Sequence, residues 1–362
     1  MDRTKKLWIA LGVVLIGTFT LLGVFGREVY RQAPPIPERV VDESGTQLMT
    51  RDQILRGQRV WQSMGGQQVG SIWGHGAYQA PDWSADWLHR EATALLGIYA
   101  NGQYDKPFDD LTAEQQAGVR ERLRRELRQN RYDAATGILT VSDARARAMA
   151  LTAAHYETLF GGDASLAGLR ESYALHNNAV PDASERRDMT SFFFWTSWAC
   201  TTERPGLAVT YTNNWPHEEL VGNHPTSANL IWSFISIILL IAGIGTLVWY
   251  KSFRDKKEVP PDPAAVDPLS TIELTPSMRA VWKYAAVVIG LFVLQVLTGA
   301  LTAHYTVQGN SFFGIPLASL VPYAVSRTWH VQLAVFWIAT AFLAAGLFLA
   351  PAVGGREPKY QR

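Results

Sequence analysis

Residues 327–353 read RTWHVQLAVFWIATAFLAAGLFLAPAV, an apolar run with a histidine near its start. From Trp329 to Val353 the run contains no Lys, Arg, Asp or Glu, and it exceeds the roughly 20 residues that a helix needs to cross a bilayer. An ionisable residue at the end of a membrane helix is costly unless it is paired or ligated, so His330 is a functional candidate. The alternative is a histidine at the level of the lipid headgroups, in contact with water.

Three further segments are long and apolar enough to span a bilayer. Leu7–Gly26 and Ser227–Tyr250 contain no charged residue, and Val281–Ala303 contains only Lys283. The first segment is too long for a signal peptide and lacks its small-residue cleavage site. The sequence therefore predicts a mostly α fold with four transmembrane helices, within residues 1–26, 227–250, 281–303 and 329–353.

Positive charges flanking these segments predict their orientation. The N-terminus, residues 251–279 and the tail 354–362 are basic, and all three lie on one side of the membrane if four helices cross it. Cytoplasmic loops carry an excess of Lys and Arg, so we expect residues 251–279 to be a cytoplasmic linker. Residues 27–226 and the loop 304–328 then lie outside, the former as one large outer domain.

Composition excludes some classes of partner and site. A net charge of +1 argues against nucleic acid, whose backbone requires a basic face. The single cysteine, Cys200, excludes an internal disulfide and any metal or c-haem site that needs two cysteines. Six histidines show no metal-binding spacing and are interpreted as structural: His75, His89, His155, His176, His217 and His224.

The outer domain is predicted to be mostly helical with loops. Thr50 and Thr112 each precede a glutamine by three residues, which is the pattern of a capping box at a helix start. Ser84 is expected to cap the helix that follows it. The helix after Thr112 is so rich in charged residues that we expect it to be solvated rather than buried.

Two long runs indicate a family. Residues 57–67 read GQRVWQSMGGQ and residues 73–83 read WGHGAYQAPDW; shorter matching runs are 211–216 (YTNNWP), 303–305 (AHY), 311–314 (SFFG) and 327–330 (RTWH). Together they strongly resemble the N-terminal part of quinol-dependent nitric oxide reductases, members of the haem-copper oxidase superfamily. The resemblance covers essentially the whole chain.

The resemblance implies a cytochrome c-like outer domain at residues 27–226 that binds no haem. Where a c-type cytochrome has Cys-x-x-Cys-His, this chain has Met64-Gly65-Gly66-Gln67. The implied electron donor is therefore a membrane quinol. The implied reaction reduces two molecules of nitric oxide to nitrous oxide and water, in denitrification or in detoxification. The implied location is the bacterial inner membrane, with the outer domain in the periplasm.

The family's cofactors are a low-spin haem b with two histidine ligands and a high-spin haem b beside a non-haem iron. Their other ligands lie on helices later than those of this chain, so residues 280–362 are expected to be only the start of the catalytic bundle. The chain is then the N-terminal portion of a longer enzyme, by truncation or by a split gene, and is inactive alone. Its implied partners are the remaining part of the enzyme, the quinol, nitric oxide and the bilayer; a homodimer stays open.

The resemblance assigns roles to individual residues. His330 corresponds to an axial ligand of the low-spin haem b, and Arg327 either pairs with a haem propionate or lies among lipid headgroups. His304 corresponds to the proton acceptor of a quinol site, because an imidazole accepts a proton as the quinol is oxidised. Gln308 stands where many relatives have an acidic residue; its amide can hydrogen-bond the quinol but cannot take its proton. Two aromatic residues either wall the quinol ring or belong to an interfacial belt: Phe312 and Phe313.

Gly76 and Tyr78 correspond to residues that approach a calcium ion in the family. A backbone carbonyl and a phenolic oxygen are oxygen ligands of the kind that calcium prefers, but two oxygens are too few. A structural role, in which Gly76 forms a turn beside a buried Tyr78, explains the two residues equally well.

Two other functions remain open on the sequence alone. A haem-copper oxygen reductase also has a haem-ligating histidine at the start of its core helices, although the fused outer domain argues against it. A non-catalytic membrane scaffold is the other, and it would bind no haem.

Overall fold

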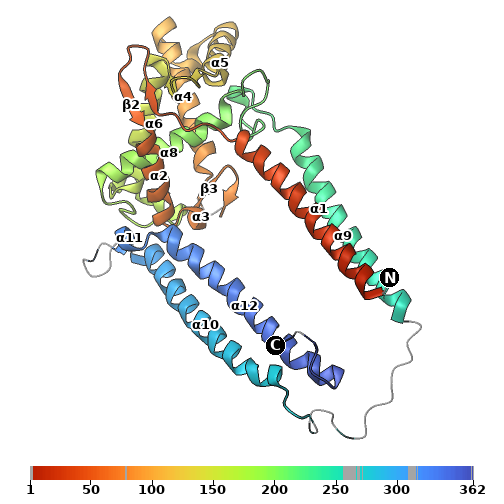
Figure 1. Ribbon diagram of the computed structural model, residues 1–362. Coiled ribbons are helices and arrows are strands. Elements are labelled where there is room, and N and C mark those ends of the chain that lie inside the picture. Colours follow the sequence, from red (N-terminus) through yellow and green to blue (C-terminus); the bar gives the residue numbers. More distant parts are fainter. Residues whose placement is uncertain are drawn as a thin grey trace. The chain divides into compact units, whose positions relative to one another are not determined.

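The computed structural model describes residues 3–77, 80–255, 266, 270, 272–308, 315, 317–359 and 361. It confirms the mostly α fold (Figure 1). The chain divides into two compact units. Unit 1 comprises Met1–Gly57, Gly70–Thr158 and Arg187–Thr226, and unit 2 comprises Gln58–Val69, Leu159–Arg186 and Ser227–Arg362. The domain boundaries expected after residues 26, 226, 250 and 279 stay predictions.

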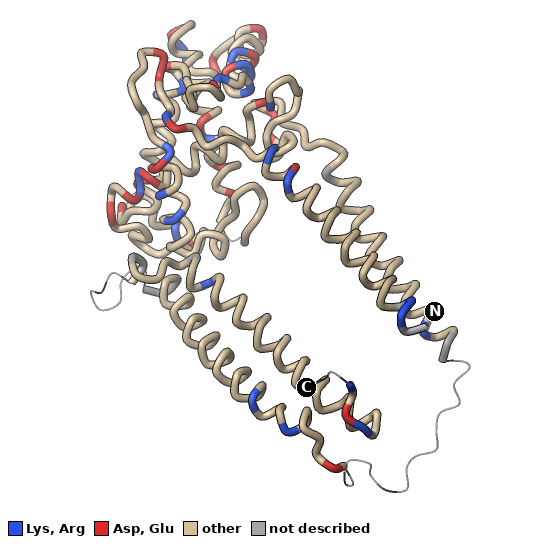
Figure 2. The backbone as a smooth tube through the Cα atoms, in the orientation of Figure 1, with Lys and Arg blue, Asp and Glu red and all other residues tan. Residues whose placement is uncertain are grey.

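The four expected membrane helices are all present. They are α1 (Arg3–Arg31), α9 (Ser227–Asp255), α10 (Pro276–Gln308) and α12 (Tyr323–Gly354). Each contains a stretch long and apolar enough to cross a membrane. Figure 2 shows that charged residues lie towards the ends of these helices and leave their middle parts uncharged. All four extend beyond the apolar segments that predicted them, because a helix continues through polar residues at the membrane surface.

The core of unit 1 lies between α4 (Trp83–Tyr104), α5 (Ala113–Arg128), α6 (Asp143–Phe160) and α8 (Ala183–Thr201). Here one expectation is wrong: α5 is not solvated on all sides, because Val119, Leu123 and Leu127 are buried in this core. These three residues are four positions apart and therefore form an apolar stripe along one face of the helix. The high overall charge of α5 concealed this stripe.

Aromatic residues fill the space between α4, α6 and α8. Trp87 stacks on Tyr156 with ring centroids 5.4 Å apart, and Trp83 stacks on Phe193 at 5.8 Å. All four side chains are almost completely buried. The apolar run of α8 is thus part of a soluble core and not a membrane span.

Two of the three predicted capping residues are found in the structure, and the third is not. Thr50 caps α2 (Arg51–Ser63) and Thr112 caps α5, each with its predicted glutamine partner. Helix α4, however, is capped by Asp82 and not by Ser84. The carboxylate of Asp82 accepts hydrogen bonds from the backbone N–H groups of Ser84 and Ala85. A carboxylate is favoured at this position because it also interacts with the positive end of the helix dipole.

A small sheet that the sequence did not predict flanks the helices of unit 1. Its strand order is β2-β1-β6-β5, with β1 (Arg39–Val41) and β6 (Ile138–Thr140) parallel. The other two strands are β2 (Gln47–Thr50) and β5 (Tyr132–Asp133). The remaining elements are short: α3 (Gly66–Val69), β3 (Ser71–Ile72), β4 (His75–Gly76), η1 (Phe108–Asp110), η2 (Ala164–Leu166), α7 (Ala167–Ser172), η3 (Glu219–Val221) and α11 (Leu317–Leu320).

Candidate functional site

Helices α10 and α12 of unit 2 lie side by side and bring His330 against a neighbouring helix (Figure 1). Thr302 on α10 and Ser326 on α12 share a hydrogen bond of 2.9 Å between their hydroxyl oxygens. Ser326 also donates to the backbone carbonyl of Thr298 at 3.0 Å. These bonds lie one turn from His330 and hold the two helices in register.

The imidazole of His330 is oriented by α10. Its Nδ1 lies 2.9 Å from the backbone carbonyl oxygen of Gln295. A carbonyl can only accept, so Nδ1 carries the proton, and in the neutral ring Nε2 then carries the free electron pair. Metal-binding histidines in proteins almost always donate their other ring N–H in this way. The geometry therefore suits a histidine that binds a metal through Nε2.

A glycine on α10 makes room for this ring. A Cβ atom at Gly299 would lie 2.8 Å from both Nδ1 and Cε1 of His330. Such a contact is too short for any other residue, so His330 could not keep its present position beside a larger side chain. The sequence indicated His330 but not Gly299, because the two are linked only by the packing of two helices.

The side chain of Gln295 adds a second contact to α12. Its Oε1 accepts a hydrogen bond from Nε1 of Trp337 at 2.6 Å. The Trp337 ring in turn packs edge-on against Phe292 at 5.8 Å. Gln295 thus binds α12 through its carbonyl at His330 and through its amide two turns further on. The sequence alone indicated neither Gln295 nor Trp337.

Arg327 contacts another segment of unit 2. Its Nη1 donates to Oε1 of Gln67 in α3 at 2.8 Å. No other hydrogen bond of this guanidinium is found among the described residues. Four of its five N–H groups therefore remain available to an anion.

Two tyrosines meet close to this face of α12. Tyr305 of α10 packs edge-on against Tyr323 at 5.9 Å. The hydroxyl of Tyr305 donates to the backbone carbonyl of Val321. The hydroxyl of Tyr323 is buried and has no partner among the described residues. A ligand bound at His330 with an oxygen near Tyr323 would satisfy this hydroxyl. The orphaned hydroxyl of Tyr323 and the electron pair on Nε2 of His330 therefore both fit a haem beside His330.

The predicted quinol residues are only partly described. His304 lies near the end of α10, half-buried, with its ring 6.2 Å from that of Tyr305. Gln308 ends α10, but its side chain lies outside the described residues. Phe312 and Phe313 lie entirely outside the described residues. The quinol site therefore stays a prediction.

The proposed calcium residues are also only partly described, since Tyr78 lies outside the described residues. Gly76 pairs with Ser71 between β4 and β3 and has a φ of 147°, and a Cβ there would overlap the carbonyl oxygen of Gly70. This close approach accounts for the glycine without a metal. Among the described residues, no group of three or more His, Cys, Asp or Glu could hold a metal ion.

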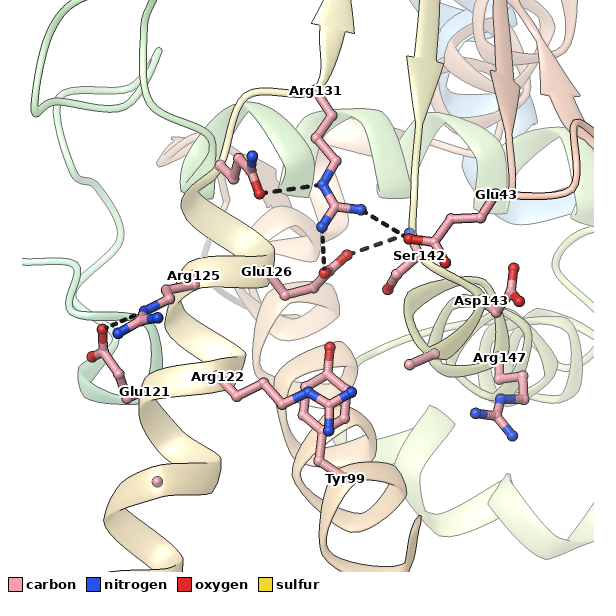
Figure 3. A pocket seen from close by; sticks show the side chains of 13 residues that line it. Glu43, Tyr99, Glu121, Arg122, Arg125, Glu126, Arg131, Ser142, Asp143 and Arg147 are labelled. Atoms are coloured by element: carbon pink, nitrogen blue, oxygen red, sulfur yellow. Dashed lines mark hydrogen bonds and ion pairs between the residues drawn. The ribbon is translucent and has the colours of Figure 1, made fainter. Parts of the chain in front are cut away.

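A cavity in unit 1 contains none of the predicted site residues (Figure 3). It has a volume of about 720 Å³ and lies between α4, α5 and α6. Glu126 and Glu43 both pair with Arg131, at 3.1 Å and 3.4 Å, and the guanidinium of Arg122 lies over the ring of Tyr99 at 4.1 Å. Arg125 also pairs with Glu121 at 3.0 Å, and these contacts within the wall together account for most of its charged residues.

Two family models match the chain. Residues 37–217 match the cytochrome c-like domain of NorB, a nitric oxide reductase component, and residues 279–362 match cytochrome c and quinol oxidase polypeptide I. A comparison with curated proteins finds no match. The second match includes His304, Arg327 and His330. Together with the four apolar helices, this match indicates a membrane-embedded oxidoreductase of the haem-copper oxidase type. The first match covers half of the chain, and the chain therefore belongs to the NorB family of nitric oxide reductases.

Proposed function

We propose that the chain forms part of a nitric oxide reductase whose electrons come from a membrane quinol. The quinol gives two electrons and two protons and becomes a quinone. Two molecules of nitric oxide take up the two electrons and the two protons and become nitrous oxide and water, so the reaction balances.

Cysteine chemistry supports a quinol over a cytochrome as the donor. A c-type haem is attached through cysteines, and the only cysteine, Cys200, is completely buried. Burial raises the pKa of its thiol far above the usual value, which keeps the sulfur protonated and unreactive. The cytochrome c-like domain therefore has no cysteine available to attach a c-type haem, and this supports a donor dissolved in the bilayer.

We propose that His330 is one axial ligand of a low-spin haem b. The observation that carries this proposal is the hydrogen bond from Nδ1 of His330 to the carbonyl of Gln295, which leaves Nε2 for iron. A six-coordinate haem at this position would carry single electrons from the donor towards the site of nitric oxide reduction. The second axial ligand would come from another part of the enzyme.

The test is His330→Ala in the complete enzyme that contains this chain. The low-spin b-type spectrum should disappear while the protein stays in the membrane. Thr340→Val is a matched control, because the hydroxyl of Thr340 lies on the same helix and donates only to the carbonyl of Phe336. Survival of the low-spin haem with normal bis-histidine absorption would show that the ligand lies elsewhere.

We further propose that His304 accepts a proton from the bound quinol. A neutral imidazole can accept the proton of a quinol hydroxyl as the quinol is oxidised. Removal of such an acceptor typically lowers a rate by about a hundredfold or more.

His304→Ala should therefore depress quinol-driven consumption of nitric oxide by about that factor. Turnover driven by an artificial one-electron donor should be spared, since that donor bypasses the quinol pocket. If both activities fall together, His304 supports the fold or the haem, and the quinol binds elsewhere.

An oxygen reductase is the second candidate, because the match over residues 279–362 is to an oxidase polypeptide. The match over residues 37–217 names nitric oxide reductase instead, and on this ground we favour nitric oxide as the substrate. Quinol-driven consumption of nitric oxide and of oxygen, measured on one preparation, separates the two. Oxygen consumption without nitric oxide consumption would reject the first proposal.

A further inference from the structure

Tyr323 is the first residue of α12. Its side chain is 3% exposed, and its hydroxyl has no partner among the described residues. A buried hydroxyl without a hydrogen bond costs free energy, so native proteins rarely keep one that has no acceptor. The hydroxyl of Tyr323 therefore calls for an acceptor that the described residues do not supply.

The neighbouring tyrosine, Tyr305, does have an acceptor for its hydroxyl within the chain. The two tyrosines pack edge-on, and the hydroxyl of Tyr305 donates to the carbonyl of Val321. Of two phenols in one contact, only that of Tyr305 has its hydrogen bond within the described chain. The two residues consequently make a matched pair for an experiment.

The position of Tyr323 on α12 indicates where its acceptor lies. Tyr323, Arg327 and His330 are spaced i, i+4 and i+7, so they lie on one face of the helix. At about 1.5 Å of rise per residue, Arg327 is about 6 Å and His330 about 10 Å along the axis from Tyr323. One face thus presents a phenol O–H, guanidinium N–H groups and the free Nε2 of an imidazole, in that order.

The positive charge of Arg327 indicates which kind of acceptor the hydroxyl of Tyr323 would have. Its one hydrogen bond among the described residues goes to Gln67, which is neutral. A guanidinium at the end of a membrane helix is stabilised by an anion, and a carboxylate accepts from both a guanidinium and a phenol. A neutral quinol would satisfy the phenol but would leave the charge of Arg327 without a counterion.

We propose that Tyr323 and Arg327 together bind a carboxylate, a propionate of the haem whose iron His330 holds. This inference rests on the proposed ligation by His330. Tyr323 acts as a positioning residue, which holds the edge of the macrocycle and lowers the effective negative charge near the iron.

The experiment compares Tyr323→Phe with Tyr305→Phe in the complete enzyme, prepared with haem and from cells starved of haem. With haem present, Tyr323→Phe should lower the thermal unfolding temperature, because a charge-assisted hydrogen bond is lost. In the haem-free protein the same change should leave that temperature unchanged or raise it, since no bond is lost. Tyr305→Phe should lower it in both forms.

The midpoint potential of the low-spin haem is the second measurement. Loss of a donor leaves the propionate more negative, which favours ferric iron, so Tyr323→Phe should lower the potential. A tenfold change in the ratio of ferric to ferrous haem corresponds to about 59 mV for a one-electron couple, and we expect a shift of up to that size. Tyr305→Phe should leave the potential unchanged.

Three results would overturn the inference. An equal loss of stability with and without haem would mean that Tyr323 bonds to the protein. An unchanged potential with a raised KM for quinol would mean that the quinol is its ligand. An unchanged potential with unchanged stability would mean that it has no ligand. Retention of the low-spin haem in His330→Ala tests the underlying ligation separately, since that variant leaves Tyr323 in place.

Discussion

At position 299 of α10, a side chain would occupy the space that the ring of His330 fills. Gly299→Ala should therefore displace the imidazole and reduce the content of low-spin haem in the purified enzyme. Gly290→Ala is the control on the same helix, because a Cβ there meets nothing within 4 Å. That control should keep its haem. A normal optical spectrum in Gly299→Ala would show that the two helices can separate without loss of the site.

His155 of α6 predicts how stability depends on pH. Burial, and then the positive charge of Arg90, lower its pKa below the ordinary value of 6.5. Below pH 6.5 the unfolded chain binds a proton more readily than the folded chain, so the free energy of unfolding falls as the pH falls. The contribution of His155 is fully present above 6.5 and is lost as the pH drops through the lowered pKa.

The measurement is the unfolding temperature between pH 7.5 and pH 5. His155→Gln should flatten the profile at the acid end. His75→Gln, at an exposed position, should not. An unchanged profile in His155→Gln would assign the acid sensitivity to other groups.

At the scale of elements, α4 and α6 are joined by a buried ion pair. Nε of Arg145 lies 2.8 Å from Oε1 of Glu91, and both side chains are nearly inaccessible to solvent. Glu91 also accepts from Nε1 of Trp87 at 2.9 Å. Removal of one partner from such a pair leaves an uncompensated buried charge.

Glu91→Ala should accordingly destabilise the protein by about 3–5 kcal/mol in denaturant unfolding. The double variant Glu91→Leu with Arg145→Met should recover most of that loss, because apolar side chains of similar volume replace both charges. A double variant as unstable as the single one would mean that the pair itself, and not the orphaned charge, stabilises the contact between α4 and α6.

At the scale of the whole molecule, the testable property is the orientation of the four membrane helices. Reporter fusions after Arg27 and within 309–324 should report a periplasmic location, and fusions within 260–269 a cytoplasmic one. The reason is the excess of Lys and Arg at the N-terminus and at residues 251–279. A cytoplasmic signal from 309–324 would contradict the assignment of four spans.

Local patterns in the sequence determined the membrane helices and the capping boxes at Thr50 and Thr112. Each depends on residues that are close together in the chain: an uncharged run, or a threonine three residues before a glutamine. The choice of His330 likewise came from its place in such a run and from the resemblance to a family. None of these properties depends on how the helices pack.

Tertiary structure decided the surroundings of His330. Gln295 and Gly299 lie more than 30 residues before it, and nothing in their own neighbourhood marks them. Their importance arises because α10 and α12 pack in one register, which puts a carbonyl at Nδ1 and an open position beside the ring. The orphaned hydroxyl of Tyr323 and the buried face of α5 became visible for the same reason. Contacts between helices depend on their relative rotation and register, and a local pattern of residues does not specify either.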